Sequence, residues 1–240
     1  MCTVSWVHQP DGYHLLCNRD EKLTRGRALA PRLQEEFGVR YVAPADADFG
    51  GTWIAVNEFG VALCLVNGEA AFRAARPLRS RGLLIRELIW ARSVDDCAFL
   101  LGQLDLTLFA PFKLVLLEPG RSATLAGWDG ACTAIASDGD SQIPLTSSSY
   151  DDAGVRRFRQ DDFARRVGTR RPIDPALLYW FHANHASSPD AYAACMHRDD
   201  AETVSFSWIV VTREEIRFLY SPAAPCRFSP CEQQLLARAA

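Results

Sequence analysis

Lysine is nearly absent from this chain of 240 residues: Lys22 and Lys113 are its only lysines, and arginine carries the remaining positive charge. The formal net charge is only −3. This balance excludes a general electrostatic attraction to nucleic acid or to an anionic membrane surface. The shortage of lysine indicates no function by itself, because a GC-rich genome produces the same bias. We therefore expect neither nucleic acid nor membrane as a partner.

Long apolar runs are also missing, although 48% of the residues are hydrophobic. No run approaches the ~18 apolar residues that a membrane helix needs. At the N-terminus, His8, Pro10 and Asp11 interrupt any apolar segment of a secretory signal. We expect a cytoplasmic protein whose apolar residues fill a sizeable core. The sequence gives no indication of an oligomeric state.

No pair of cysteines has CxxC spacing, although the chain contains eight cysteines. In a reducing cytosol we expect most of them to be free thiols that act as small core residues. Cys17 and Cys64 lie within apolar runs, which agrees with that expectation. Cys226 and Cys231 have a spacing that is poor for zinc.

Histidines offer one further combination for a metal ion. His182, His185 and His197 lie near Cys195 in the sequence. An HxxH pattern without a supporting acidic residue is weak support for a zinc site. We therefore expect no metal site, and we expect no cofactor.

The order of the expected elements predicts an α+β fold. Strands and helices do not alternate as in a parallel sheet, so antiparallel sheets with helices on their outer faces are the economical solution. No repeat or linker divides the chain, and we expect residues 1–240 to form one domain. The expected strands are 3–8, 13–18, 52–57, 61–67, 113–118, 123–128, 204–212 and 216–220, and the expected helices are 83–92, 94–104, 151–167, 175–184 and 189–195.

Local patterns make some of these elements more specific. The continuous apolar run 61–66 predicts a strand that is covered on both faces. Ser93 followed by Asp96 resembles a capping arrangement for the helix 94–104. By contrast, residues 25–48 mix prolines and charges, and we expect a long loop with one short helix there.

The first two strands predict an N-terminal hairpin around the turn 9–12. Cys2 then lies at the start of the first strand, and the run Asn18-Arg19-Asp20-Glu21 lies at the end of the second. In an antiparallel pair these two places are neighbours. The polar run is therefore able to face the N-terminus.

Cys2 directly follows Met1, and cysteine is small enough for methionine aminopeptidase to remove Met1. The mature chain then begins with a thiol and a free α-amine on one residue. These groups titrate near pH ~8.5 and ~8, so the amine is able to take the thiol proton. A Met-Cys start alone indicates little, because many proteins begin this way without a catalytic cysteine.

Four motifs follow one another in the first part of the chain: Cys2, the run 18–21, Gly50-Gly51-Thr52-Trp53, and the segment 57–67, which begins Asn-Glu-Phe-Gly and ends at Asn67. In this combination the chain resembles the NRDE family, also called the TANGO2-like family. The resemblance is strongest over residues 1–67. It implies membership of the N-terminal nucleophile hydrolases and their fold, a four-layered αββα sandwich.

Segment 57–67 also looks like the corresponding hairpin of choloylglycine hydrolases and penicillin V acylases. This resemblance implies that Asn67 helps to form an oxyanion hole, where a preorganised donor contributes ~3–4 kcal/mol. It also implies that Asp20, in the run Asn18-Arg19-Asp20, orients and charges the α-amine of Cys2.

Two positions depart from the pattern of those amidases. They carry an arginine just before the Asn-x-Asp run, where this chain has Cys17; Arg19 is able to supply a guanidinium, but from a different strand face. Their second asparagine corresponds here to Ser147. Residues 195–205 look like the last section of acyl-CoA:penicillin acyltransferase-type proteins, which implies that Arg198 lies near the active site. A solvated loop arginine is the alternative.

Several residues have a second, structural interpretation. Trp53 and Trp6 line an acyl pocket or, as is commoner for aromatic residues at strand spacing, belong to the core. Asp20 is a partner of the amine or a loop carboxylate, and Asn67 is an oxyanion donor or a turn cap. The seven arginines between positions 156 and 171 bind phosphates of a CoA or nucleotide ligand, or they form a solvated, salt-bridged helix face with neighbouring aspartates, which we favour.

The sequence therefore predicts a cysteine N-terminal nucleophile amidohydrolase or acyltransferase that acts on a small-molecule amide or acyl substrate. In this interpretation Cys2 attacks the carbonyl, its own amine is the base, and Asn67 stabilises the oxyanion. The alternative is a non-catalytic binding protein of the same fold that handles lipids or haem, as suggested for TANGO2 relatives, because a fold does not establish an activity.

Overall fold

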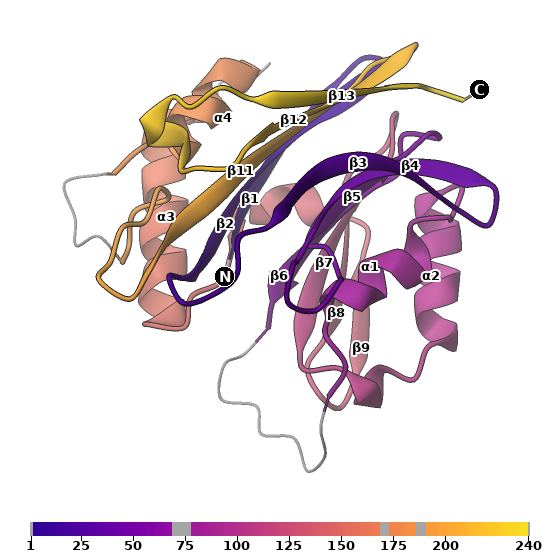
Figure 1. Cartoon of the computed structure of the whole chain (residues 1–240), viewed down its shortest axis with the longest axis horizontal. Helices are drawn as coiled ribbons and strands as arrows, with labels where there is room; N and C mark the ends of the chain where they lie inside the picture. The colour runs from indigo at the N-terminus through magenta and orange to yellow at the C-terminus, as the bar shows by residue number, and fades with distance from the viewer. Residues whose placement is uncertain (1, 69–77, 169–172, 186–190, 240) are drawn as a thin grey trace.

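Two antiparallel sheets face each other, and helices cover their outer faces (Figure 1). This arrangement is seen in a computed structural model that describes residues 2–68, 78–168, 173–185 and 191–239. Figure 1 shows helices on the outer side of each sheet, so that the described part of the chain forms four layers. The predicted α+β class and the αββα sandwich with mainly antiparallel strands are confirmed.

The six-stranded sheet has the order β10-β1-β2-β11-β12-β13. The N-terminal hairpin β1-β2 forms as the turn at residues 9–12 predicts, and β11 pairs with the other edge of β2. The strands are β1 (Cys2–Gln9), β2 (Gly12–Lys22), β10 (Leu145–Thr146), β11 (Ala201–Val211), β12 (Glu215–Ser221) and β13 (Glu232–Ala237).

The seven-stranded sheet runs in sequence order, from β3 to β9. Every residue from Ala62 to Val66 is buried, as the continuous apolar run predicts for a strand covered on both faces. The strands are β3 (Leu29–Glu36), β4 (Val39–Ala45), β5 (Ile54–Asn57), β6 (Ala62–Asn67), β7 (Phe112–Leu117), β8 (Thr124–Trp128) and β9 (Thr133–Ala136).

Three of the four described α-helices begin at residues whose side chains cap them. Ser93 Oγ accepts a hydrogen bond from the Asp96 amide at 3.0 Å, as the sequence predicts, and Asp151 and Asp174 cap the two later helices in the same way. The α-helices are α1 (Gly82–Leu88), α2 (Val94–Gln103), α3 (Asp152–Arg166) and α4 (Pro175–His182), and the short 3-10 helices are η1 (Leu106–Leu108), η2 (Gly139–Gln142) and η3 (Pro225–Arg227). Among the described residues, no helix combines the length and the apolar character needed to cross a membrane.

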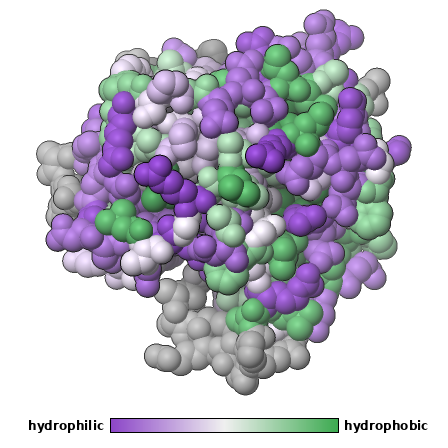
Figure 2. Space-filling model, viewed as in Figure 1, coloured by the Kyte–Doolittle hydropathy of each residue, from purple (hydrophilic) through white to green (hydrophobic). Residues whose placement is uncertain are grey.

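Three apolar clusters fill the three spaces between the four layers. The central cluster joins the sheets: Trp6 and Cys17 of one sheet pack with Val56 and Cys64 of the other. The outer clusters hold α1 and α2 on the seven-stranded sheet, and α3 and α4 on the six-stranded sheet. On the face shown in Figure 2, hydrophilic residues are widespread and hydrophobic ones are interspersed among them.

Residues 25–48 are not the long loop that the sequence analysis expected, because most of them form β3 and β4. β3 is an edge strand, where Pro31 lies at a register irregularity and needs no ladder partner. The tight turn that follows uses positive φ angles at Phe37 and Gly38. Charged side chains on the exposed side of β3 concealed its alternation from sequence inspection.

Two other expectations about local structure were wrong. The second strand does not end at Asn18 but continues to Lys22, so that the Asn18–Glu21 run forms the last part of β2, where β11 pairs with it. The helix expected at 189–195 does not form over residues 191–195, which adopt turns and bends, and residues 189 and 190 lie outside the described part. Hydrogen bonds to other elements hold this segment instead, such as Cys195 N to the Asn184 carbonyl at 3.1 Å.

Candidate active site

Cys2 is the first residue of β1 and lies directly opposite Arg19 of β2. Because opposite residues in an antiparallel pair share a face, both side chains point toward the other sheet. The Cys2 side chain belongs to the central cluster together with Val4 and Trp6, and only 5% of the residue is exposed. The thiol therefore lies between the two sheets, at the start of β1.

A pocket of about 340 Å³ opens at this place. Cys2 and Arg19 line it from the six-stranded sheet, and Trp53 and Asn67 line it from the seven-stranded sheet. Four of the residues singled out in the sequence are thus brought together. The pocket joins Cys2 to Asn67 at the end of β6, although these residues are more than sixty positions apart in the chain.

Arg19 is fixed in the pocket wall by three contacts. Its guanidinium donates to Asp46 at 2.7 Å, lies 3.6 Å from Glu21, and covers the ring of Trp53 at 4.5 Å. Trp53 also belongs to the central apolar cluster that contains Cys2 and Val4. Trp53 is therefore both a pocket residue and a core residue.

The backbone around the Gly50-Gly51-Thr52-Trp53 motif explains why positions 50 and 51 are glycine. Gly50 has a φ of +66°, which favours glycine. A Cβ on Gly51 would meet the backbone of Gly82 at 2.6 Å, so the start of α1 could not approach this loop if residue 51 carried a side chain. Both Gly51 and Gly82 line the pocket. The motif therefore brings α1 close to the cysteine.

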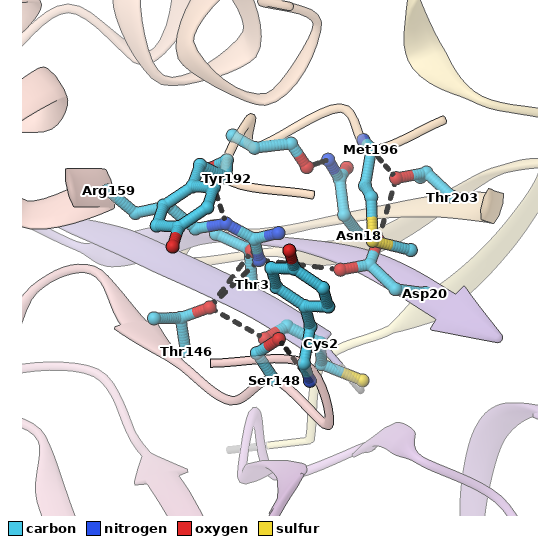
Figure 3. A network of polar contacts seen from close by, with 12 residues as sticks. Cys2, Thr3, Asn18, Asp20, Thr146, Ser148, Arg159, Tyr192, Met196 and Thr203 are labelled. Carbon is cyan, nitrogen blue, oxygen red and sulfur yellow. Dashed lines mark hydrogen bonds and ion pairs between the residues drawn. The ribbon is translucent and has the colours of Figure 1, made fainter. Parts of the chain in front are cut away.

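The other face of the β1-β2 hairpin carries a buried polar network (Figure 3). The Asp20 carboxylate accepts a hydrogen bond from Thr203 Oγ1 at 2.7 Å and lies 3.4 Å from the guanidinium of Arg159. Arg159 also donates to Thr3 and, at 2.9 Å, to Thr146. These contacts hold Asp20 rigidly beside the strand end that bears Cys2.

Arg159 is a residue whose role sequence inspection missed. The arginines between positions 156 and 171 were expected on a solvated helix face, but Arg159 of α3 is 1% exposed. The signal was present in the spacing, because Val155, Arg159 and Phe163 recur every four residues and form one stripe. For Arg165 and Arg166 the expectation fits, since both pair with Asp162 near the surface.

Asn18 and Ser147 do not line the pocket, and they contact the backbone of segments that support it. Asn18 Nδ2 donates to the carbonyl oxygens of His182 and Ala194, at 2.9 and 2.8 Å. Ser147 donates its backbone N–H to the Cys2 carbonyl at 3.1 Å, and its buried hydroxyl has no hydrogen-bond partner among the described residues. Asn18 therefore anchors β2 to the segment after α4, and Ser147 fixes the backbone of Cys2.

Arg198 lies elsewhere. It pairs with Asp200 at 2.6 Å and covers the ring of Tyr150 at 5.1 Å. It is not among the described residues that line the Cys2 pocket. His182 is also apart from the other histidines singled out in the sequence, because its ring is fully buried and hydrogen-bonds Ser5 at 2.8 Å.

Comparison with known families identifies the chain. The sequence profile of the family described as Transport and Golgi organisation 2, or TANGO2, matches residues 1–136. The chain belongs to the TANGO2 family. No curated protein matches its sequence.

Solved structures that resemble this TANGO2-family chain include, by name, an acylase, a hydrolase and an amidase. Penicillin V acylase from Agrobacterium tumefaciens has a TM-score of 0.59 at 11% identity, over 99% of this chain and 86% of that one. A C2A mutant of conjugated bile acid hydrolase from Clostridium perfringens has 0.56 at 9% identity, over 99% and 92%. The Caenorhabditis elegans ortholog of N-acylethanolamine-hydrolyzing acid amidase has 0.57 at 12% identity, over 87% and 92%. At these identities the likeness establishes the fold, that of the N-terminal nucleophile hydrolases.

The surroundings of Cys2 in this TANGO2-family chain disfavour the thiolate form. A hydrogen bond with the thiol of Cys17 and burial raise the pKa of Cys2 well above its ordinary value, and the charge of Asp20 adds to this. Burial lowers the pKa of Arg81, another pocket residue, whereas Cys2, when it is ionised, and the Glu21 carboxylate oppose that shift. Cys17 therefore acts directly on the candidate nucleophile.

Proposed function

We propose that this protein is a cysteine N-terminal nucleophile amidohydrolase or acyltransferase that acts on a linear amide or a related acyl group. One observation carries the proposal: Cys2, at the start of β1, lines the same pocket as Asn67, at the end of β6. Attack on a carbonyl group requires a nucleophile and a donor that stabilises the oxyanion. In this proposal one sheet supplies the nucleophile and the other supplies the donor. The shared fold with amide-cleaving enzymes supports the same conclusion.

The proposed reaction begins after removal of Met1, when Cys2 carries a free α-amine. The Cys2 sulfur attacks the substrate carbonyl carbon, and the α-amine takes the thiol proton. The side-chain amide of Asn67 donates to the oxyanion, a contribution worth about 3–4 kcal/mol. Collapse of the intermediate forms a thioester and releases the amine, which leaves with the proton from the α-ammonium. Water or an acceptor amine then attacks the thioester and restores the thiol.

Asp20 is the proposed partner of the α-amine. Its carboxylate is 1% exposed and is held by Thr203 and Arg159, so it has a fixed position behind the first residue of β1. A fixed negative charge favours the protonated amine that forms when the thiol proton is transferred. Arg159 limits this effect, since its own charge balances that of Asp20.

The pocket wall favours a substrate with an anionic group next to an apolar acyl part. Arg19, Arg25 and Arg79 of the wall each pair with a carboxylate of the protein. Among the described pocket arginines, Arg81 has no carboxylate within ion-pair distance, and it donates instead to the Pro111 carbonyl at 2.9 Å. Arg81 is therefore the cation that we propose for substrate recognition.

Two further properties belong to this proposal. We propose that residues 1–240 act as one domain, since the central apolar cluster draws on both sheets. We also propose a cytoplasmic location, because all eight cysteines are free thiols and a reducing compartment preserves them.

Alkylation with iodoacetamide-alkyne near neutral pH tests the nucleophile. The measurement uses a Cys132→Ser/Cys231→Ser background, which removes the two exposed thiols. The mature protein should label at Cys2 faster than at buried Cys97, and Cys2→Ala should lose that fast phase. A form that retains Met1 should label slowly, because it lacks the free amine on residue 2. Equal labelling of Cys2 and Cys97, or Met1 retained in the purified protein, would contradict the proposal.

A substrate panel then tests the reaction class. Pairs of N-acyl amides with the same acyl chain, with and without a carboxylate on the amine part, are assayed with wild type and Arg81→Met. We expect wild type to prefer the carboxylate-bearing member, and Arg81→Met to lose that preference while it retains Cys2 labelling. Binding without turnover by a labelling-competent protein would favour the non-catalytic alternative.

A further inference from the structure

Two histidines and two cysteines meet on the outer side of the six-stranded sheet, away from the pocket. They are His185, Cys195, His197 and Cys226, and their ligand atoms all lie within 4.8 Å of one another. Three separate segments supply them: the turn after α4, the turn before β11, and η3. His185 is exposed, Cys195 is buried and the other two are half-buried, so the cluster lies just beneath the surface.

The spacing of these atoms fits one tetrahedral metal ion. His197 Nε2 is 3.6 Å from the Cys195 sulfur and 3.3 Å from the Cys226 sulfur. With metal–sulfur and metal–nitrogen bonds of about 2.3 and 2.0–2.1 Å, the sulfur–nitrogen edge of a tetrahedron is about 3.6 Å. The rings of His185 and His197 have centroids 5.0 Å apart, so the second imidazole is close enough to complete the set.

A contact between His197 and a residue outside the four candidate ligands supports a metal site independently. His197 turns Nε2 toward the two sulfur atoms and Nδ1 toward the carboxylate of Glu202, at 3.4 Å. Metal-bound histidines commonly donate their second ring N–H to a carboxylate in this way, which fixes the tautomer and the ring orientation. Arg227 holds the same carboxylate at 2.7 Å.

We propose that His185, Cys195, His197 and Cys226 bind one zinc ion as a structural site. Two thiolates and two imidazoles in a tetrahedron favour zinc, and four protein ligands leave no position for a substrate or water. The spread of the ligand atoms, all within 4.8 Å, fits a single ion better than an iron–sulfur cluster with two iron atoms. Sequence inspection did not find this set because Cys226 lies on a distant turn and His182 does not take part.

The zinc ion would join η3 to the segment that supports the candidate active site. The Ala194 carbonyl accepts from Asn18, and the Met196 amide donates to Thr203 Oγ1 at 2.9 Å, which in turn donates to Asp20 (Figure 3). Cys195 and His197 alternate with these two residues along the chain. Metal binding therefore fixes the backbone that positions Asp20 and Asn18.

Metal analysis of the intact protein tests the proposal. Protein expressed in zinc-supplemented medium and purified under reducing conditions should contain about one zinc ion per chain. Cys226→Ser and His197→Gln should lose most of it, whereas Cys132→Ser and His8→Gln, outside the cluster, should keep it. Replacement of zinc by Co²⁺ should produce thiolate-to-cobalt charge-transfer absorption and the intense visible bands of a tetrahedral site.

A second measurement uses the wild-type protein and therefore does not depend on whether the variants fold. In wild type, a mercurial that caps thiols should release zinc to a chromogenic indicator, and chelation should expose two additional reactive thiols and lower the melting temperature. Protein without zinc or cobalt binding, or with a Cys195–Cys226 disulfide under reducing conditions, would overturn the proposal.

Discussion

Asp20 and Arg159 form an ion pair in the interior, directly behind the strand that begins with Cys2. Their charged atoms are 3.4 Å apart, and each side chain is 1% exposed. One partner comes from the last part of β2, and the other comes from the middle of α3. The pair therefore couples the position of a helix to the position of the candidate nucleophile.

Loss of Arg159 should destabilise the protein strongly. Arg159→Met leaves the Asp20 carboxylate buried without its cation, which costs about 3–5 kcal/mol. The double variant Arg159→Met/Asp20→Asn should lose clearly less than the sum of the two single variants. Urea unfolding measures all three, and Arg165→Met, on the exposed side of the same helix, is the matched control. If Arg159→Met lowers the free energy of unfolding no more than the control does, the coupling between Asp20 and Arg159 is contradicted.

Asn67→Ala should separate acylation of Cys2 from its alkylation. An oxyanion donor contributes about 10²–10³-fold to acyl transfer, but it has no role in attack on an iodoacetamide carbon. Acylation by a p-nitrophenyl ester should therefore slow to that extent in the variant. Alkylation with iodoacetamide should proceed at the wild-type rate. If both reactions slow together, Asn67 supports the fold of the pocket and not the oxyanion.

Cys17→Ala should make Cys2 ionise at a lower pH. The hydrogen bond with Cys17 is the largest cause that raises the pKa of the Cys2 thiol, so its removal increases the thiolate fraction at a given alkaline pH. The pH profile of Cys2 alkylation should shift toward lower pH. Cys97→Ala, which removes another buried thiol, should leave the profile unchanged. An unshifted profile in Cys17→Ala would show that burial alone keeps Cys2 protonated.

His182 should make the protein sensitive to mild acid. Burial and the charge of Arg159 lower the pKa of His182 from 6.5 to about 3. Below pH 6.5 the unfolded chain binds a proton here that the folded chain does not bind, so stability falls as the pH falls. The contribution of this residue is about 1.4 kcal/mol for each pH unit. Urea midpoints are measured above and below pH 6.5. As the pH is lowered, the midpoint should fall more steeply in wild type than in His182→Gln. The same pH dependence in both proteins would contradict the account.

The sequence was sufficient for the family, the layered fold and most of the first hairpins. Cys2, Trp53 and Asn67 could be selected because short motifs mark them, and strand pairing brings these motifs to one pocket. β3 could not be recognised, since this edge strand carries a proline and several charges, a composition that resembles a loop. The end of β2 was placed too early for a similar reason, because buried Asn18 and Asp20 are polar residues that other elements satisfy.

Long-range partners were the part of the site that the sequence did not reveal. Arg159 lies in an arginine-rich helix, and only its place on the apolar stripe distinguishes it from its solvated neighbours. Arg81 follows Arg79 closely in the sequence and no motif marks it, and it becomes notable once α1 packs on Gly51 beside Cys2. Contacts of this kind depend on how the layers pack, and periodicity within one element does not report them.

Mass analysis of the N-terminal peptide after brief reaction with an acylating substrate tests the central claim most directly. The account predicts that the peptide begins at Cys2, that it gains the mass of one acyl group, and that hydroxylamine removes this group as expected for a thioester. Cys2→Ser should accumulate the acyl form as an ester or react slowly, and Cys2→Ala should not react. A peptide that retains Met1, or acylation only at other cysteines, would contradict the account.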